Sequence, residues 1–272
     1  MEIPDLPLPS NPKTTLHFRM PIVEDALRIG NATRQNEEEF TTRYLNRLQT
    51  EHDSATWTVS DRRAVLFWIW CNSRLHHGRT LTYTCTHCGQ LHQHAFDLRD
   101  IAQDMELLQV PPYVEVNIPV NGTPTEWVLK PMTGRGAEEL QRMYANLPPK
   151  EAPNYRDELT NVKCVELALQ AHLKDEPDDF LVAGELRYAQ IKSMSLFGEL
   201  PALVASIKAM KEALHHGLPM KIVDGEPMLY APPHTCPVRA KEGETKQTRL
   251  FFPFRNRDYL PDAVISLMDD DD

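Results

Sequence analysis

The chain has 272 residues, enough for one large domain or two small ones. Its 29 Lys and Arg against 39 Asp and Glu give a formal net charge of -10, and the terminal run 269–272 supplies four of the acidic residues. An acidic chain lacks the positive field that attracts nucleic acid or anionic lipid, so we expect neither as a partner. The 11 Gly and 22 Pro have no fixed period, which excludes a collagen-like chain and leaves a globular one.

The composition also predicts a protein that is made and kept in a reducing cytosol. The longest apolar run, Ala64–Cys71, is far shorter than the ~18–20 residues of a membrane span. The start of the chain has neither the basic nor the apolar region of a secretory signal. Its cysteines are odd in number and do not have the spacing of a small secreted disulfide framework. They stand at positions 71, 85, 88, 164 and 236.

The first 22 residues are predicted to form an extended arm. Prolines in this segment exclude a helix, because proline fixes its φ angle and cannot donate a backbone hydrogen bond. The next segment, 23–49, contains no proline. It carries Phe40, Tyr44 and Leu48 at the spacing of one helical face, which predicts a helix.

A buried helix is predicted after this segment. Thr58 and Asp61 have the Thr-x-x-Asp spacing of a capping box, in which each side chain bonds the backbone of the other residue. The apolar run Ala64–Cys71 follows, and Gly78 offers a stop. A helix that is apolar on nearly all faces is typically surrounded by a core.

Two β-hairpins are predicted next. Residues 79–97 alternate polar and apolar side chains on both sides of Cys85-Thr-His-Cys88-Gly89, which places this motif at the turn. A second hairpin is predicted from 113–120 and 126–130, because Asn121-Gly122 between alternating runs is a strong hairpin signal. Thr133 can then cap a helix over 135–146.

Three prolines at 148, 149 and 153 mark the expected boundary between two subdomains. Helical spacing follows over 155–173, 180–193 and 196–216, and the chain after 219 is irregular and β-like. We therefore expect an α+β protein, mainly α-helical, with small β-hairpins and a zinc-ribbon-like metal knuckle. Its expected parts are an N-terminal arm (1–22), a helical and β-hairpin subdomain (23–147), a helical subdomain (148–218) and a β-like segment with the acidic tail (219–272).

Cys85 and Cys88 have the spacing of half a tetrahedral zinc site. Two intervening residues let both thiolates reach one ion at about 2.3 Å. Two sources can supply the other ligands: His92 and His94 on the same hairpin, or His234 and Cys236 near the end of the chain. We favour the distant pair, because a further thiolate suits zinc and because neighbouring prolines would hold 234 and 236 extended with both side chains on one face. The predicted metal ligands are thus Cys85, Cys88, His234 and Cys236, and the expected cofactor is a structural zinc.

Other interpretations of the cysteine pair stay open. The two cysteines can be hairpin residues without a ligand. A redox role would require the pair at the start of a helix, where the helix N-terminus lowers a thiol pKa, whereas this pair lies between predicted strands. A catalytic zinc would require an open position and a nearby general base, and the sequence contains no His-Glu-x-x-His or His-x-Glu pattern.

The remaining candidates favour structural roles. His76-His77 and His215-His216 each fall at the end of a predicted helix, where the dipole favours an imidazolium cap. Cys71 and Cys164 lie on apolar helices and are expected in the core. Thr133-Gly-Arg-Gly136 lacks the Gly-Lys-Ser/Thr ending of a phosphate loop, so we expect no nucleotide there and no enzyme overall.

The order of these features resembles the baseplate hub assembly proteins of contractile-tailed bacteriophages, also described as baseplate or tail assembly chaperones. The stretch that carries the resemblance is an Asp-started apolar helix within 57–78, the Cys85-Thr-His-Cys88-Gly89 turn and the Asp-Leu segment within 96–101. The late helix ending at Gly217 and the Cys236 segment look like the family's C-terminal half. This chain departs from the pattern in having His234-x-Cys236 where a second Cys-x-x-Cys is expected.

The resemblance implies a non-enzymatic protein that promotes assembly of the tail baseplate through contacts with hub proteins, as a homo- or hetero-oligomer. It would act in the host cytoplasm, either leaving after assembly or staying in the virion baseplate. Two alternatives from other classes stay open: a zinc- or thiol-dependent enzyme, and a zinc-stabilised adaptor module outside phages.

Overall fold

The computed structural model describes residues 2–30 and 32–261, so the acidic run at 269–272 lies outside the described residues. In the described part, helices hold 41% of the residues and strands 22%. The chain is thus a mixed α+β protein, and the finer expectation of a mainly α-helical one is not confirmed. The helices are α1 Val23–Ile29, α2 Glu37–Leu48, η1 Ser54–Thr56, α3 Val59–Ser73, α4 Leu98–Gln103, α5 Gly134–Ala145, α6 Tyr155–Ala168, α7 Phe180–Ser193, α8 Glu199–Ala213, α9 Pro237–Lys241 and η2 Asn256–Tyr259.

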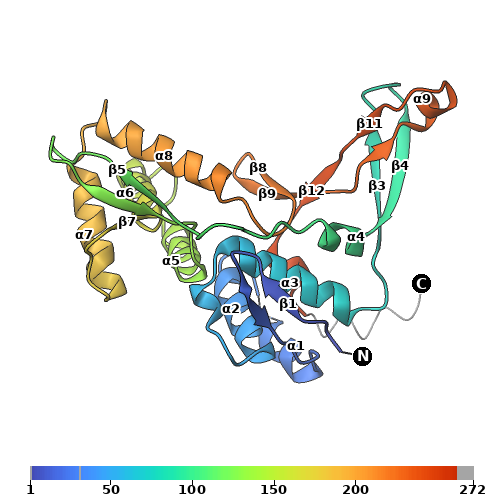
Figure 1. Ribbon diagram of the computed structural model, residues 1–272, viewed down its shortest axis with the longest axis horizontal. Coiled ribbons are helices and arrows are strands. Elements are labelled where there is room, and N and C mark those ends of the chain that lie inside the picture. Colours follow the sequence, from blue (N-terminus) through green and yellow to red (C-terminus); the bar gives the residue numbers. More distant parts are fainter. Residues whose placement is uncertain (1, 31, 262–272) are drawn as a thin grey trace.

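The strands form several small antiparallel sheets. Their orders are β1-β2, β3-β4, β5-β6-β7, β12-β9-β8 and β10-β11. Figure 1 shows them distributed over three parts of an elongated molecule. The bounds are β1 Leu6–Leu8, β2 Asn11–Leu16, β3 Gly78–Thr84, β4 Leu91–Asp97, β5 Val114–Asn117, β6 Glu126–Leu129, β7 Ala171–Leu173, β8 Met220–Val223, β9 Glu226–Tyr230, β10 His234–Thr235, β11 Gln247–Thr248 and β12 Phe251–Pro253.

The first core surrounds α3, as the apolar run in the sequence predicts. The side chains of Val65, Leu66, Phe67 and Ile69 are completely buried. They pack against the N-terminal hairpin, α1, α2 and the segments around β9, β12 and η2. We call this part the body; it joins residues from both ends of the described chain.

The predicted capping box at the start of α3 is confirmed. Thr58 Oγ1 accepts the Asp61 N–H at 3.0 Å, and Asp61 Oδ2 accepts the Thr58 N–H at 3.1 Å. The buried Asp61 carboxylate also accepts the Ser10 N–H and hydroxyl at 2.8 and 2.6 Å. The cap therefore fixes the N-terminal hairpin on α3 as well as starting the helix.

The single helix predicted over 23–49 is wrong, because the structure has two helices there. Helix α1 ends at Ile29 with Gly30 as its C-cap, and α2 begins at Glu37. Between them the Thr33 N–H donates to Asn36 Oδ1 at 2.6 Å. Glycine and short polar side chains favour turns over helix, and the apolar spacing of 40–48 belongs to α2 alone.

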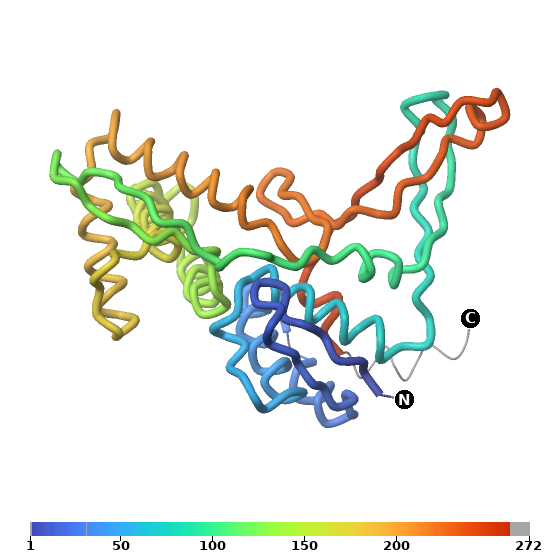
Figure 2. Tube along the Cα trace, in the orientation of Figure 1, coloured from blue at the N-terminus to red at the C-terminus, as the bar shows by residue number. Residues whose placement is uncertain are grey.

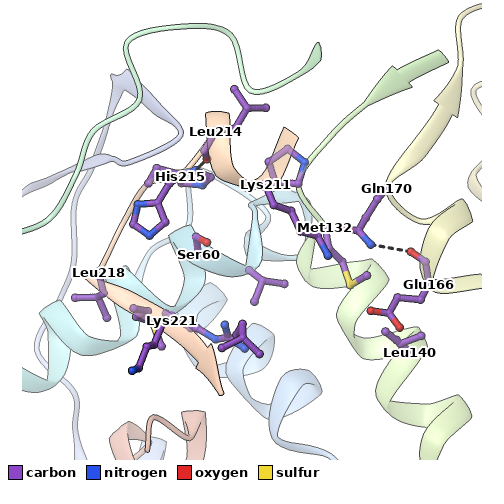
Figure 3. Close-up of a pocket in the computed structure, with 16 residues that line it drawn as sticks. Ser60, Met132, Leu140, Glu166, Gln170, Lys211, Leu214, His215, Leu218 and Lys221 are labelled. Carbon is purple, nitrogen blue, oxygen red and sulfur yellow. Dashed lines mark hydrogen bonds between the residues drawn. The ribbon is translucent and has the colours of Figure 1, made fainter. Parts of the chain in front are cut away.

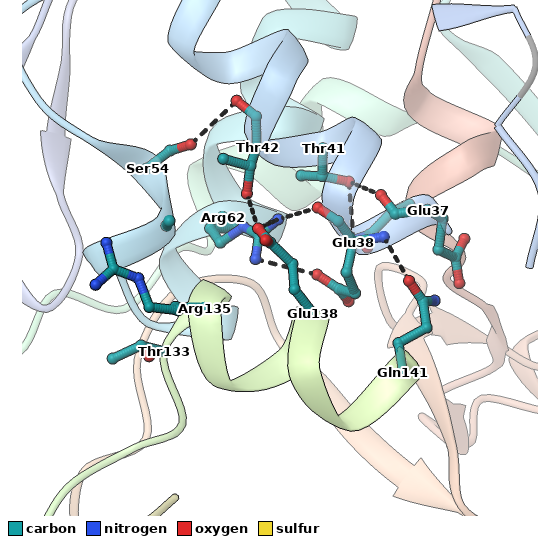
Figure 4. Close-up of polar contacts among 12 residues, drawn as sticks. Glu37, Glu38, Thr41, Thr42, Ser54, Arg62, Thr133, Arg135, Glu138 and Gln141 are labelled. Carbon is teal, nitrogen blue, oxygen red and sulfur yellow. Dashed lines mark hydrogen bonds and ion pairs between the residues drawn. The ribbon is translucent and has the colours of Figure 1, made fainter. Parts of the chain in front are cut away.

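A buried arginine joins α2, α3 and α5 (Figure 4). Arg62 on α3 is completely buried, and its guanidinium lies 3.3 Å from the Glu38 carboxylate and 3.9 Å from that of Glu138. Thr133 caps α5 as predicted, and Gly134 follows it. A Cβ at Gly134 would lie 2.2 Å from Arg62 Nη1. The absence of a side chain at this glycine therefore leaves room for the arginine at the start of α5.

The second core lies between the β5-β6-β7 sheet and helices α6 to α8. The predicted hairpin of β5 and β6 is confirmed, with Asn121 and Gly122 at positive φ in a tight turn. Trp127 on β6 is 1% exposed and packs with Leu203 and Ile207 of α8. This core takes residues from both sides of 148–153, so the cores do not divide the chain at the prolines. Prolines interrupt a helix without determining which core its neighbours join.

A third part projects from the body. It consists of β3 and β4 with the segment that carries β10, α9 and β11, and we call it the projection (78–97 and 231–250). Figure 2 shows these two stretches, far apart in the sequence, running side by side to the same tip. The hairpin predicted over 79–97 is confirmed, with Gly78 paired to Asp97 and Thr84 to Leu91.

Candidate metal centre

The tip of the β3-β4 hairpin brings Cys85 and Cys88 together. The turn closes through the Cys85 N–H bonded to the Gln90 carbonyl at 2.9 Å and the Gly89 N–H bonded to the Cys85 carbonyl at 2.8 Å. Gly89 has a φ of 72°, in the left-handed region that favours glycine. The Cys-x-x-Cys-Gly motif therefore forms the knuckle that its spacing predicts.

His92 on β4 contacts this knuckle with its side chain. Its Nε2 lies 3.1 Å from Cys88 Sγ. His94 lies two residues further along the same strand, and its Nε2 is 3.1 Å from the Pro232 carbonyl oxygen. A carbonyl only accepts, so His94 donates this bond and joins the two stretches of the projection.

Cys236 enters the knuckle from the distant segment. It is the N-cap of α9, with Pro237 as the first helical residue, and its side chain is completely buried. The Cys236 N–H donates to the Lys246 carbonyl at 2.9 Å, which closes the β10-β11 hairpin beneath it. His87 in the knuckle lies with its Nε2 3.1 Å from the Gln247 carbonyl, so a side-chain contact to the backbone joins the two segments beside the sulfurs.

The ligand atoms of Cys85, Cys88, His92 and Cys236 all lie within 4.8 Å of one another. We call these four residues the Cys3His cluster. With Zn–S bonds of about 2.3 Å, a tetrahedral zinc requires sulfurs about 3.8 Å apart, so the cluster needs only small adjustments to hold such an ion. Three thiolates and one imidazole also match the donors that soft or borderline metals prefer. The four residues could therefore hold a metal.

The electrostatics of the knuckle favour a thiolate at Cys85. Burial raises the pKa of this thiol, but the backbone N–H groups of His87 and Cys88 and a hydrogen bond with Cys236 outweigh that effect and lower the pKa to about 7. At Cys88 the Gln90 N–H lowers the pKa, whereas burial and the thiols of Cys236 and Cys85 raise it more. Deprotonating further thiols beside the first is thus unfavourable without a cation, and a bound divalent metal supplies that charge.

The geometry differs from the predicted ligand set at one residue, because it brings His92 and not His234 to the three cysteines. His234 Nε2 lies 2.5 Å from the Tyr83 hydroxyl, and its ring centroid is 4.2 Å from that of His94. The prediction assumed an extended chain through Cys236, with 234 and 236 on one face. The chain instead turns from β10 into α9 at Cys236, which removes the two side chains from a common face.

The other candidates from the sequence lie outside this cluster. Cys71 is buried in the first core, where burial raises the pKa of its thiol to about 12, and Cys164 packs half-buried beside the second core. His77 Nε2 lies 2.7 Å from the Cys71 carbonyl, the helix-end role expected for it. His216 is buried, with Nδ1 2.6 Å from the Leu214 carbonyl and Nε2 2.7 Å from Thr58 Oγ1.

Comparisons with known proteins add no assignment. A scan of protein-family models, a search of curated proteins and a search of solved structures each find no match to this chain. Among the described residues, none of the helices combines the length and the apolar character that crossing a membrane requires. The interpretation of the Cys3His cluster therefore depends on its own geometry and chemistry.

Proposed function

We propose that this chain is a zinc-stabilised, non-enzymatic protein that assembles the tail baseplate of a contractile-tailed bacteriophage through contacts with hub proteins. The observation that carries the proposal is the Cys3His cluster, in which one knuckle and one distant cysteine join two stretches of the chain. The phage context comes from the resemblance in the helix of 57–78, the cysteine turn and the segment 96–101. Its expected place is the host cytoplasm, with or without retention in the virion baseplate.

Zinc is the metal that suits the cluster best. Cys3His is one of the ligand sets of structural zinc sites, and it contains none of the oxygen donors that magnesium and calcium require. Four protein ligands fill a tetrahedral zinc and leave no position for a substrate or an activated water. The metal would thus hold the fold, which is the reason for proposing a non-enzymatic role.

The projection has few other sources of stability. No residue of β3 is buried, and Phe96 is the only buried residue of β4. A two-stranded hairpin with so little apolar burial is marginal in water. A zinc ion that joins it to Cys236 would make the projection a rigid element with open strand edges, a form that suits docking on partner subunits.

Purification of a tagged chain from phage-infected cells tests the functional half of the proposal. The expected result is co-purification of a tail hub protein in a fixed ratio. Recovery of the chain without any tail protein would contradict the phage assignment and leave a zinc-stabilised adaptor. Retention in purified virions would identify the chain as a baseplate component.

Metal analysis of the purified chain tests the zinc half separately. We expect about one zinc per chain, because the described residues contain one four-ligand cluster. Cys85→Ser should abolish zinc binding, and the matched variant Cys164→Ser should keep it, because Cys164 lies beside the second core. Disulfide reductase turnover by the wild-type protein would contradict the structural role and favour a thiol enzyme.

A further inference from the structure

A second candidate site lies away from the Cys3His cluster, in a cavity of about 350 Å³ where α3, α6, α8 and β8 meet. None of the proposed metal ligands lines it. Leu218, from the first core, and Leu214, from the second, both contribute to its wall, together with Met132 and Leu140. The volume is in the range of small-ligand sites, and the wall offers a largely apolar surface.

Three cations line this cavity, and one of them, Lys221, lies with its Nζ 3.5 Å from the centroid of the Phe251 ring. The other two have no charged partner among the described residues. Arg63 comes from α3 and Lys211 from α8, and neither forms an ion pair with any residue that the structure describes. Two nearby carboxylates pair with other cations. Glu38 lies 3.3 Å from Arg62, and Glu166 lies 2.8 Å from Lys163 Nζ. The positive charge of the cavity is therefore not balanced by its own wall.

Arg63 is the stronger of these two observations. Its Nε is buried and has no hydrogen-bond partner in the described part of the chain. Burial lowers the pKa of this guanidinium, Glu38 and Glu37 only partly offset the effect, and Arg62 adds to it. Arg63 is half-buried, and a buried guanidinium nitrogen without a partner is unfavourable, so a bound anion would remove that cost.

Gln170 adds a hydrogen-bond acceptor to the same cavity. It is 1% exposed, and its Nε2 donates to the Glu166 carbonyl at 2.9 Å, as Figure 3 shows. Only the NH₂ group can donate to a carbonyl, so this bond fixes the orientation of the amide. The other amide atom, Oε1, is buried without a partner among the described residues. Figure 3 shows Lys211 and Met132 on the neighbouring wall.

We propose that this cavity binds an N-acylated apolar amino acid by its free carboxylate, either as a small molecule or as the C-terminal end of a polypeptide. The carboxylate pairs with Arg63 and Lys211, and the amide N–H of the ligand donates to Gln170 Oε1. The apolar side chain lies against Met132 and Leu140. The site goes beyond the baseplate proposal and does not require it, since no metal ligand takes part.

Calorimetric titration with N-acetyl-leucyl-leucine tests the site. The peptide acid should bind saturably, and its C-terminal amide should bind on the order of tenfold more weakly, because the amide removes a charge-assisted pair. Lys211→Gln should weaken binding of the acid by a similar factor. The matched variant Lys208→Gln, an exposed lysine on the same helix that does not line the cavity, should leave binding unchanged.

Three results would overturn the proposal: no saturable binding of the acid at millimolar concentration, equal affinity for acid and amide, or unchanged binding in Lys211→Gln. An octapeptide ending in Leu-Leu distinguishes the two sources of the ligand. Affinity equal to or above that of the dipeptide identifies a polypeptide end. Binding more than about tenfold weaker identifies the free amino acid derivative, because the added residues then clash with the cavity wall.

Discussion

The body and the projection are stabilised in different ways. In the body, α3 buries Val65, Leu66, Phe67 and Ile69 completely, and residues from both ends of the described chain pack around it. In the projection, β3 buries none of its side chains and β4 buries one. A few polar contacts, such as that of His87 with the Gln247 carbonyl, and the Cys3His cluster bring the two stretches together at the tip. A metal bound to this cluster would stabilise two hairpins that meet with little apolar surface to bury.

Removing Cys236 should have the largest effect, because it is the only member of the Cys3His cluster that the described part of the distant segment supplies. Cys236→Ser should abolish zinc binding and remove most of the roughly 10 kcal/mol or more that a structural zinc contributes at neutral pH. Hydrogen exchange should show β3 and β4 losing protection while α3 keeps it. Full zinc content in this variant would contradict a site that joins the two stretches.

A core substitution in the body should lower the stability of the body and leave zinc binding unchanged. Phe67 is completely buried and lies with its ring centroid 5.3 Å from that of Tyr259. Phe67→Ala should lower the free energy of unfolding by about 3–5 kcal/mol through lost burial and the cavity it leaves. Zinc content should stay at that of the wild type. Loss of zinc at temperatures where the body is still folded would show that the two parts are not independent.

Acid should weaken the body through Asp25. Arg19 holds the pKa of this buried carboxyl well below its usual range against the effect of burial, with help from the Ile22 N–H and Arg47. Because the folded pKa is below the unfolded one, the stabilisation is present at neutral pH and is lost as the pH falls below about 4.

The variant Asp25→Asn should lower the free energy of unfolding at pH 7 by about 2 kcal/mol, because solvent screens part of the attraction of the half-exposed Arg19. It should also reduce the difference in stability between pH 7 and pH 3, measured by urea unfolding. Equal acid sensitivity in both proteins would exclude Asp25 as the cause.

The smallest effect is expected for a substitution of His234, measured as a change in zinc affinity. Its Nε2 bonds the Tyr83 hydroxyl, outside the four ligand atoms. His234→Gln should change zinc affinity by less than about tenfold, the lower end of what residues outside the ligand shell contribute. His92→Gln is the matched variant and should lose the site. The reverse order of effects, measured by competition with a chelator, would restore the ligand set predicted from the sequence.

Local features of the fold follow from the sequence. The Thr58-Asp61 capping box, the tight turn at Asn121-Gly122 and the hairpin turn at Cys85 to Gly89 are all present, because each depends on a few neighbouring residues. The break between α1 and α2 was missed, although Gly30 was a visible signal for it. Residues on both sides of prolines 148–153 contribute to the second core, which the sequence does not indicate because core membership depends on long-range packing.

Three of the four cluster residues could be predicted, and the fourth was only an alternative. His92 follows Cys88 by four residues on the same hairpin, a local signal that favoured it. The sequence favours His234, because the neighbouring prolines predict an extended chain through Cys236. Nothing in the sequence indicates that the chain turns into α9 at this residue. The cavity residues Arg63, Gln170 and Lys211 carried no signal at all, because they come from different elements and meet only in the folded chain.

X-ray absorption at the zinc edge of the wild-type protein tests the central claim most directly. The predicted spectrum has three sulfur ligands at about 2.3 Å and one nitrogen at about 2.0–2.1 Å. Two sulfurs with two nitrogens would contradict the Cys3His cluster and favour ligation by paired histidines. A protein purified without zinc and unable to bind it would contradict the metal site altogether.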